Sequence, residues 1–142
     1  MTNNFVGLNL SKFEKAILHE NCILKLFRMG SNIHVVRLEN AEGNLITSKE
    51  GFRLIPTLEK ANQDYLKDFL CFKEIPSFQV IDSHLDQQII SGSTLTIKKN
   101  GLYLLGILKS WDGTVIVRKQ SNRLMNLLVN IELHFNAVPL PT

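Results

Sequence analysis

Apolar and polar side chains alternate near the end of the chain, from residue 127 to residue 135. The apolar positions are Leu127, Val129, Ile131, Leu133 and Phe135, and the positions between them are Leu128, Asn130, Glu132 and His134. A period of two is typical of a strand with one buried face. The pattern predicts a half-buried β-strand at 127–135 and, with it, an antiparallel sheet in the C-terminal half.

The first part of the chain predicts a helix followed by a three-stranded meander. Ser11 and Glu14 have the spacing of a capping box, which indicates a short helix over 12–19. Strand-like runs follow at 23–29, 33–39 and 45–49. Segments rich in Gly, Asn and Ser separate these runs, so each strand is expected to pair with the next.

The hydrophobic period changes to that of a helix after residue 53. Apolar side chains recur at Leu54, Leu58, Ala61, Tyr65, Phe69 and Phe72. Charged and amide side chains fill the opposite side of this helix, and Pro56 suits its first turn. We expect one long amphipathic helix over 54–72 that packs against the sheet.

The pattern returns to strands after Pro76. Strand-like runs lie at 78–81, 87–90, 95–99, 102–109, 115–119 and 127–135. Asn100-Gly101 and Asp112-Gly113 are strong signals for two-residue hairpin turns. The pairs that such turns bring together are Lys99 with Leu102 and Trp111 with Thr114.

The expected fold class is α+β, with a mainly antiparallel sheet packed against one long amphipathic helix. The sheet combines the N-terminal meander with the C-terminal hairpins. The chain has 142 residues, of which 44% are hydrophobic, and this suits a single domain over 1–142. We expect short flexible ends at about 1–7 and 137–142, and we detect no internal repeat in the sequence.

The expected compartment is the cytoplasm, with no membrane partner. The longest apolar run, 102–108, is far too short to cross a bilayer. Residues 1–6 have neither the basic nor the long apolar region of a secretory signal. Cys22 and Cys71 lie beside bulky apolar residues, which indicates buried, reduced thiols.

The predicted turns divide the side chains of the C-terminal strands between two faces. The face expected in the core carries Leu95, Ile97, Leu102, Leu104, Leu108, Val115 and Val117. The opposite face combines the apolar residues Tyr103, Leu105, Ile107, Trp111 and Ile116 with the cations Lys98, Lys109 and Arg118. An apolar centre with a polar rim is typical of an interface, so this second set is the candidate partner-binding surface.

Three occupants of that surface remain open at this point. The first helix or the N-terminal meander could cover it within the domain. A second copy, giving a homodimer, or another protein could bind there, with Trp111 as an anchor. Single-stranded nucleic acid could bind because aromatic rings stack on bases and cations hold phosphates, although the net charge of +3 is modest.

The segment 82–86 is dense in potential metal ligands and catalytic groups. Asp82, His84 and Asp86 share one side of an extended chain and could bind a divalent metal ion. Polar clusters between strands are more typical of loops, and no nucleophile that His84 could serve as a general base can be named. We find no phosphate-binding loop and no nucleophile elbow, so we expect no catalytic residue, no metal site and no cofactor.

The leading hypothesis is a small non-enzymatic protein that acts by self-association or by binding a protein partner. The surface is the face around Trp111. The first alternative is single-stranded nucleic-acid binding on the same aromatic and basic face. The second alternative is an enzyme or small-ligand carrier with a pocket between helix and sheet, for which Asp82 and His84 are the candidates.

Overall fold

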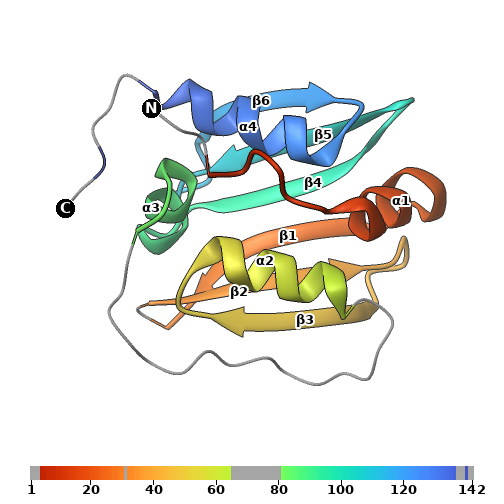
Figure 1. Cartoon of the computed structure of the whole chain (residues 1–142), viewed down its shortest axis with the longest axis horizontal. Helices are drawn as coiled ribbons and strands as arrows, with labels where there is room; N and C mark the ends of the chain where they lie inside the picture. Colours follow the sequence, from red (N-terminus) through yellow and green to blue (C-terminus); the bar gives the residue numbers. More distant parts are fainter. Residues whose placement is uncertain (1–3, 31, 65–80, 137–139, 141–142) are drawn as a thin grey trace.

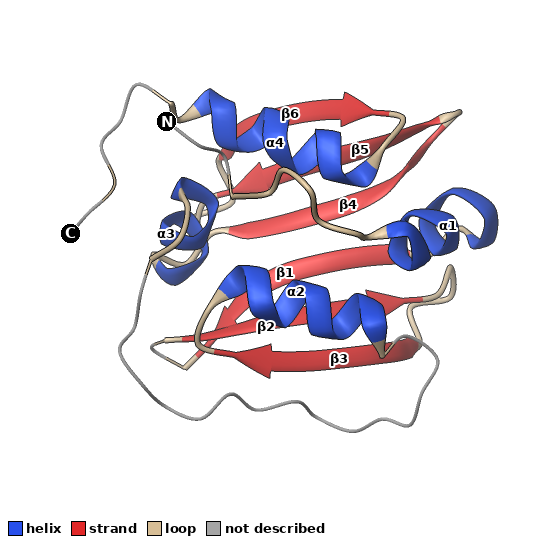
Figure 2. Ribbon diagram, viewed as in Figure 1, coloured by secondary structure: helices blue, strands red, loops and turns tan. Residues whose placement is uncertain are grey.

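The computed structural model of this protein describes residues 4–30, 32–64, 81–136 and 140. In chain order its elements are α1 (Ser11–Glu20), β1 (Ile23–Met29), β2 (Ile33–Glu39), β3 (Leu45–Gly51), α2 (Leu54–Gln63), α3 (His84–Ile90), β4 (Thr94–Asn100), β5 (Tyr103–Lys109), β6 (Val115–Ser121) and α4 (Leu124–His134). The strands form one antiparallel sheet in the order β3-β2-β1-β4-β5-β6. The described helices lie together on one side of this sheet (Figure 1, Figure 2).

The hydrophobic core lies between the sheet and the helix layer. Its fully buried members include Leu24, Leu26, Leu95, Ile97 and Leu108 from the strands and Phe13, Ile17, Leu58, Leu85 and Leu128 from the helices. Alternate residues of each strand point into this layer, because successive side chains of a strand face opposite ways. The expected α+β class with a mainly antiparallel sheet is confirmed, including the meander and the hairpins.

The helix expected over 54–72 is described only as α2, which ends at Gln63. The remainder of that range lies outside the described residues, except Asp64, as does the strand expected at 78–81 apart from Ile81. The helix layer contains α1, α3 and α4 as well as α2, so a single long helix does not cover the sheet.

The strand expected at 127–135 is wrong, because this segment forms α4 up to His134. The buried residues of α4 are Leu124, Leu127, Leu128, Ile131 and Glu132, which is the spacing of one helix face. The alternation placed Leu128 among the polar positions, yet Leu128 is fully buried. A segment this rich in apolar residues satisfies both periods, and the helical one begins earlier, at Leu124.

The strand expected at 87–90 is also wrong, because these residues end α3. Ser83 is the N-cap of α3, and its hydroxyl accepts the N–H of Asp86 at 3.0 Å. Leu85 and Ile89, four residues apart, are fully buried on the inner side of this helix. The segment 82–86 is therefore only partly a loop, since its second half is the first turn of a helix.

The start of the chain is packed more tightly than expected. Phe5 is completely buried, although it falls within the end of the chain that was expected to be flexible. The segment from Asn4 to Leu10 runs across the helix layer toward α1 (Figure 1). It contacts α4 through a hydrogen bond from the N–H of Gly7 to the Met125 sulfur.

The described chain consists of two α-β-β-β-α units in tandem. The first comprises α1, β1, β2, β3 and α2, and the second comprises α3, β4, β5, β6 and α4. The later elements of the second unit begin about 70 residues after their counterparts, as Tyr103 does after Ile33, Val115 after Leu45 and Leu124 after Leu54. Both units shift register at the matching step, after Leu38 and after Leu108. The hydrophobic pattern did not reveal this repeat, because it predicted strands where the second unit has its two helices.

The pairing of β1 with β4 joins the two units into one sheet. The paired residues are Leu24 with Ile97, Lys25 with Thr96 and Leu26 with Leu95. The leading helices are exchanged across this junction: α1 packs mainly on β4 and β5, whereas α3 packs mainly on β1 and contacts β2 and β4 to a lesser, equal extent. Each unit therefore covers part of the other unit's strands.

Hydrogen bonds to helix N-termini connect the helices into a ring. Asn62 of α2 accepts the N–H of Phe13 in α1 at 3.0 Å. At the corresponding place in the second unit, Glu132 of α4 accepts the N–H groups of His84 and Leu85 in α3, at 2.8 and 3.0 Å. These contacts satisfy backbone donors that a helix leaves unpaired at its start.

The other two links of the ring run between the units. Glu14 of α1 accepts the N–H of Leu124 in α4 at 3.0 Å, and Asp86 of α3 accepts the N–H of Leu54 in α2 at 3.4 Å. The capping box expected between Ser11 and Glu14 is therefore wrong, because Glu14 caps a different helix. A carboxylate is also favoured at a helix N-terminus by the helix dipole.

The hairpin between β4 and β5 turns one residue later than expected. Asn100 pairs with Tyr103 and Lys99 with Leu104, so the expected pair of Lys99 with Leu102 is wrong. Gly101 has φ +63 and takes the first central position of the turn, where a positive φ favours glycine. The partner of Lys99 moves by two residues, so the strand residues keep their predicted faces. Leu102, expected in the core, lies in the turn and is 85% exposed.

The loop between β5 and β6 is longer than expected. The N–H of Ser110 donates to the carbonyl of Thr114 at 2.8 Å, which leaves a three-residue loop over 111–113. Trp111 and Thr114 are therefore not paired as predicted. Gly113, with φ +88, ends the loop as is typical of this hairpin class. The bulge beside it also exposes Val115, which was expected in the core.

We predict that Gly106→Val destabilises the protein by about 1–3 kcal/mol through overpacking. A Cβ at Gly106 would lie 3.1 Å from Ile131 Cδ1 and 3.3 Å from Leu127 Cδ2. The first unit has the reverse arrangement, with Val36 on the strand and the smaller Thr57 and Ala61 on the helix. Urea denaturation measures the change in unfolding free energy.

The control for Gly106→Val gives α4 the smaller side chains that α2 has at the corresponding positions, Thr57 and Ala61. Combining it with Leu127→Thr and Ile131→Ala removes the crowding, so the added cost of the valine should disappear in that background. An equal cost of Gly106→Val in both backgrounds would contradict overpacking against α4.

Candidate interaction surface

The outer face of β4, β5 and β6 carries most of the residues proposed as a partner-binding surface. The described helices pack on the opposite face of the sheet (Figure 2). α1 therefore does not cover the outer face, and the meander lies beside it in the same sheet rather than over it. Within the described residues, no helix or strand covers this surface.

The apolar part of the surface is narrower than the sequence suggested. Leu105 is only 5% exposed, so it adds little accessible apolar area to this face. Ile107 and Ile116 are half-buried, and Ile116 also packs against the core. Tyr103, at 47%, is the most exposed apolar side chain on these strands apart from Val115.

Trp111 does not lie on the strand face where the sequence analysis placed it. It sits in the 111–113 loop and is 81% exposed. Its Cβ lies 3.2 Å from the position that a Cβ on Gly92 would take, at the start of β4. Trp111 therefore marks the end of the three strands rather than the centre of the surface.

Three cations surround Ile107 on this face. Arg118 lies directly opposite Ile107 on β6, and Lys109 follows two residues later on β5. On β4, Thr96 lies directly opposite Ile107, and Lys98 is two residues further along the strand, opposite Leu105. Lys98 is therefore a diagonal neighbour of Ile107. Such neighbours have Cβ atoms roughly 5–7 Å apart, which is within reach of one bound side chain.

These cations have no acidic partner among the described residues. Lys98, Lys109 and Arg118 take part in none of the ion pairs found there. The sequences of β4, β5 and β6 contain no Asp or Glu. The adjoining acid is Asp112 in the loop, where hydrogen bonds from Ser110 and Thr114 lower its pKa to about 2. The surface is therefore a cationic rim around a small apolar centre.

The first unit shows that this charge is not a requirement of the fold. Glu39 stands where the second unit has Lys109, and Glu50 where it has Gln120. Glu39 pairs with Lys25 at 3.0 Å and with Arg37. Burial acts to raise the pKa of Glu39, but the hydrogen bonds and charges of Lys25 and Arg37 outweigh burial and lower it.

The structure separates Asp82, His84 and Asp86, the candidate ligands of the sequence analysis. Asp82 forms a bidentate pair with Arg53, at 2.8 and 2.9 Å. The His84 ring bonds to Glu132 at 2.8 Å, and Asp86 bonds to His34 at 2.9 Å. Within the described part of the chain, no group of three His, Cys, Asp or Glu residues is placed to hold a metal ion.

The pair of His34 and Asp86 is a buried polar contact that the sequence did not reveal. Both side chains are fully buried, and they join β2 of the first unit to α3 of the second. His34 Nδ1 has no hydrogen-bond partner among the described residues. The sequence predicted that His34 lies in a strand, but it did not predict α3 or its Ser83 cap. The contact between His34 and Asp86 depends on the exchange of helices between units.

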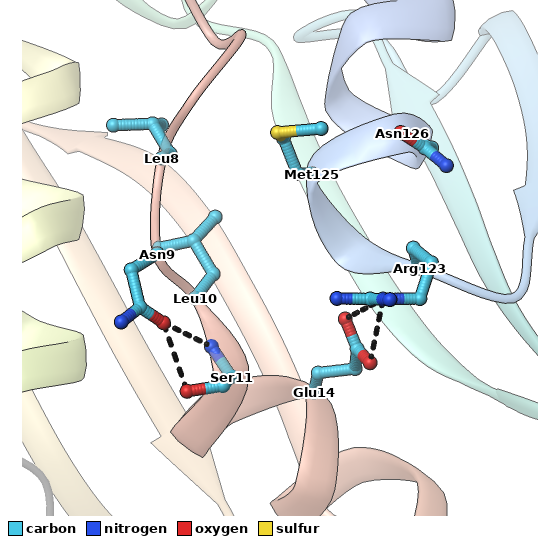
Figure 3. A pocket seen from close by; sticks show the side chains of 8 residues that line it. All are labelled: Leu8, Asn9, Leu10, Ser11, Glu14, Arg123, Met125 and Asn126. Atoms are coloured by element: carbon cyan, nitrogen blue, oxygen red, sulfur yellow. Dashed lines mark hydrogen bonds and ion pairs between the residues drawn. The ribbon is translucent and has the colours of Figure 1, made fainter.

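A small pocket of about 190 Å³ lies between the N-terminal segment and the starts of α1 and α4. Figure 3 shows Glu14 and Arg123 paired at one side of it, with Asn9 bonded to Ser11 at the other. Asp82 and His84 are not among its lining residues. The candidate polar groups of the carrier hypothesis therefore do not line this pocket.

No protein-family model, curated protein sequence or solved structure matches this chain. Among the helices of the described residues, none is long and apolar enough to cross a membrane.

We predict that Asp86→Ala costs about 3–5 kcal/mol of stability, because it leaves buried His34 and the N–H of Leu54 without their shared acceptor. Asp82→Ala removes a partly exposed pair with Arg53 and should cost under about 1 kcal/mol. Chemical denaturation of both variants checks this order. Equal losses would contradict a structural role specific to Asp86.

The stability contributed by Glu39 should depend on pH. Its folded pKa is lowered, so its contribution is present above its ordinary pKa and is lost as the pH falls through the folded value. Glu39→Gln should therefore be less stable than the natural protein at pH 7, with a difference that shrinks toward zero in acid. Denaturation at pH 7, 4 and 2.5 measures this difference, and Glu42→Gln in an exposed turn is the control.

Proposed function

We propose that this protein is a non-enzymatic binding protein that acts by receiving a protein partner or a second copy on the outer face of β4, β5 and β6. The observation that supports this most directly is that Ile107 and exposed Tyr103 lie on a face that no described helix covers. Trp111, in the loop at the end of these strands, is also exposed. Aromatic residues of this kind are enriched among interface anchors.

Single-stranded nucleic acid is the second candidate, and the unpaired cations favour it. Its weakness is the spacing of the aromatic rings. Tyr103 begins β5 and Trp111 follows its end, so the two residues are separated by roughly 20 Å or more along the strand. The strand positions between them on this face are the aliphatic Leu105 and Ile107 and the cation Lys109, so adjacent bases lack adjacent stacking platforms.

An enzyme or small-ligand carrier has less support in the geometry. Asp82, His84 and Asp86 are engaged by Arg53, Glu132 and His34 in contacts that join helices and strands. For the compartment we propose the cytoplasm, where the buried free thiol of Cys22 would stay reduced.

Photo-crosslinking tests the proposed surface. A crosslinking phenylalanine analogue replaces Tyr103, which is 47% exposed, and Leu133 on α4, which is 51% exposed, serves as the matched control position. We expect a specific protein adduct from position 103 and not from position 133. The identified partner, once purified, should bind the natural protein directly.

Substitutions then test the surface energetically. Ile107→Glu and Trp111→Ala should each weaken binding of the purified partner, or self-association, by at least tenfold. The far-UV circular dichroism spectrum of each variant should remain that of the folded protein. Sedimentation velocity over a range of concentrations measures self-association. Equal yields of protein adduct from positions 103 and 133 would show that this face is not the interface. An affinity that Ile107→Glu leaves unchanged would show the same.

A further inference from the structure

The two units share one backbone plan, and this makes their outer faces directly comparable. In the first unit the cations Lys25 and Arg37 are paired with Glu39. In the second unit the positions of Arg37 and Glu39 are taken by Ile107 and Lys109. The same backbone therefore carries a carboxylate paired with two cations in the first unit and an apolar residue among unpaired cations in the second.

The charge on this face argues against a second copy as its occupant. In a two-fold symmetric contact the same patch meets itself. Lys98, Lys109 and Arg118 of one copy would then face the same cations of the other, which is unfavourable at an interface. Strands β1, β2 and β3 carry two acids, Glu39 and Glu50. Glu39 is already bonded to Lys25 and Arg37, so Glu50 alone is left on these strands to offset three cations.

We propose that the outer face of β4, β5 and β6 binds an acidic segment of another protein. An apolar side chain of that segment rests on Ile107, and its carboxylates pair with Lys98, Lys109 and Arg118. This rests on the proposed function and deepens it by naming the chemistry of the partner. Charge complementarity carries the choice, since the strands hold unpaired cations and no acid.

The arrangement also sets what such a segment must look like. The cations lie on three neighbouring strands, which are spaced about 4.8 Å apart, around one apolar position. An acidic residue on each side of an apolar one therefore matches them. A strand-like or turn-like segment with this pattern fits better than a uniform run of acids, because Ile107 has no charge to offer.

The test uses a fluorescein-labelled twelve-residue peptide of Glu and Ser with one central Phe, titrated with the full-length protein by fluorescence anisotropy. We expect saturable binding to the natural protein that weakens when salt is raised from about 50 to about 500 mM. Lys98→Glu and Arg118→Glu should each weaken it at least tenfold. The same peptide with Gln in place of every Glu should bind at least tenfold more weakly.

A charge-matched control separates the local site from net charge. Lys15→Glu changes an exposed lysine of α1, on the helix side of the sheet, by the same amount of charge. We expect it to leave peptide binding unchanged. Equal losses from Lys15→Glu and Arg118→Glu would overturn the proposal, as would the absence of saturable peptide binding.

Two further outcomes separate this proposal from the function on which it rests. Tighter binding of a twelve-nucleotide poly-dT strand, lost in Lys98→Glu and Arg118→Glu, would overturn the acidic protein segment in favour of nucleic acid. A homodimer broken by Ile107→Glu, or a crosslinked partner insensitive to Lys98→Glu, would overturn the acidic segment while leaving a protein-binding surface in place. Failure of the crosslinking at position 103 would instead count against the proposed function itself.

Discussion

The antiparallel pairing of β1 with β4 is the contact on which the rest of the structure depends. It covers the three residue pairs from Leu24 to Leu26, yet it makes one sheet of two three-stranded units. A continuous sheet lets α1 pack on the strands of the second unit and α3 on those of the first. The helix ring then closes, because Glu14 reaches α4 and Asp86 reaches α2 only when the units are joined in this way.

Charged side chains are paired on the helix side of the sheet and, among the described residues, unpaired on the outer face of the second unit. On the helix side of the sheet, carboxylates accept hydrogen bonds from backbone N–H groups or from basic side chains. Glu132 accepts the N–H of His84 in α3, and Asp82 accepts from the Arg53 guanidinium. Unpaired buried polar groups are costly, so these groups stabilise the exchange of helices. On the outer face of the second unit the cations have no such partners, and Lys98 and Arg118 remain accessible to a ligand from outside.

Local signals predicted much of the fold, and the failures have a common cause. The strands β1, β2 and β3 follow from short apolar runs between turn residues, and the start of α2 follows from the spacing after Leu54. The second unit repeats this plan, but α4 is so apolar that two periods fit it and α3 is too short for a clear period. The outer-face residues of β5 were predicted correctly, because the pairing of β4 with β5 is shifted by two residues and a shift of two keeps each side chain on its face. Trp111 was misplaced because it lies in a three-residue loop, where the alternation of the strand ends.

The sequence by itself determined the segments that form β1 to β6, the face that most of their residues take, and the cations that gather around Ile107, because alternation and turn chemistry are local properties. Only the tertiary structure decided that Leu127 and Ile131 pack in a helix over Gly106, that Asp86 meets His34, and that no described helix covers the outer face. These outcomes depend on which unit each helix packs against, and the pairing of two strands distant in sequence settles that choice.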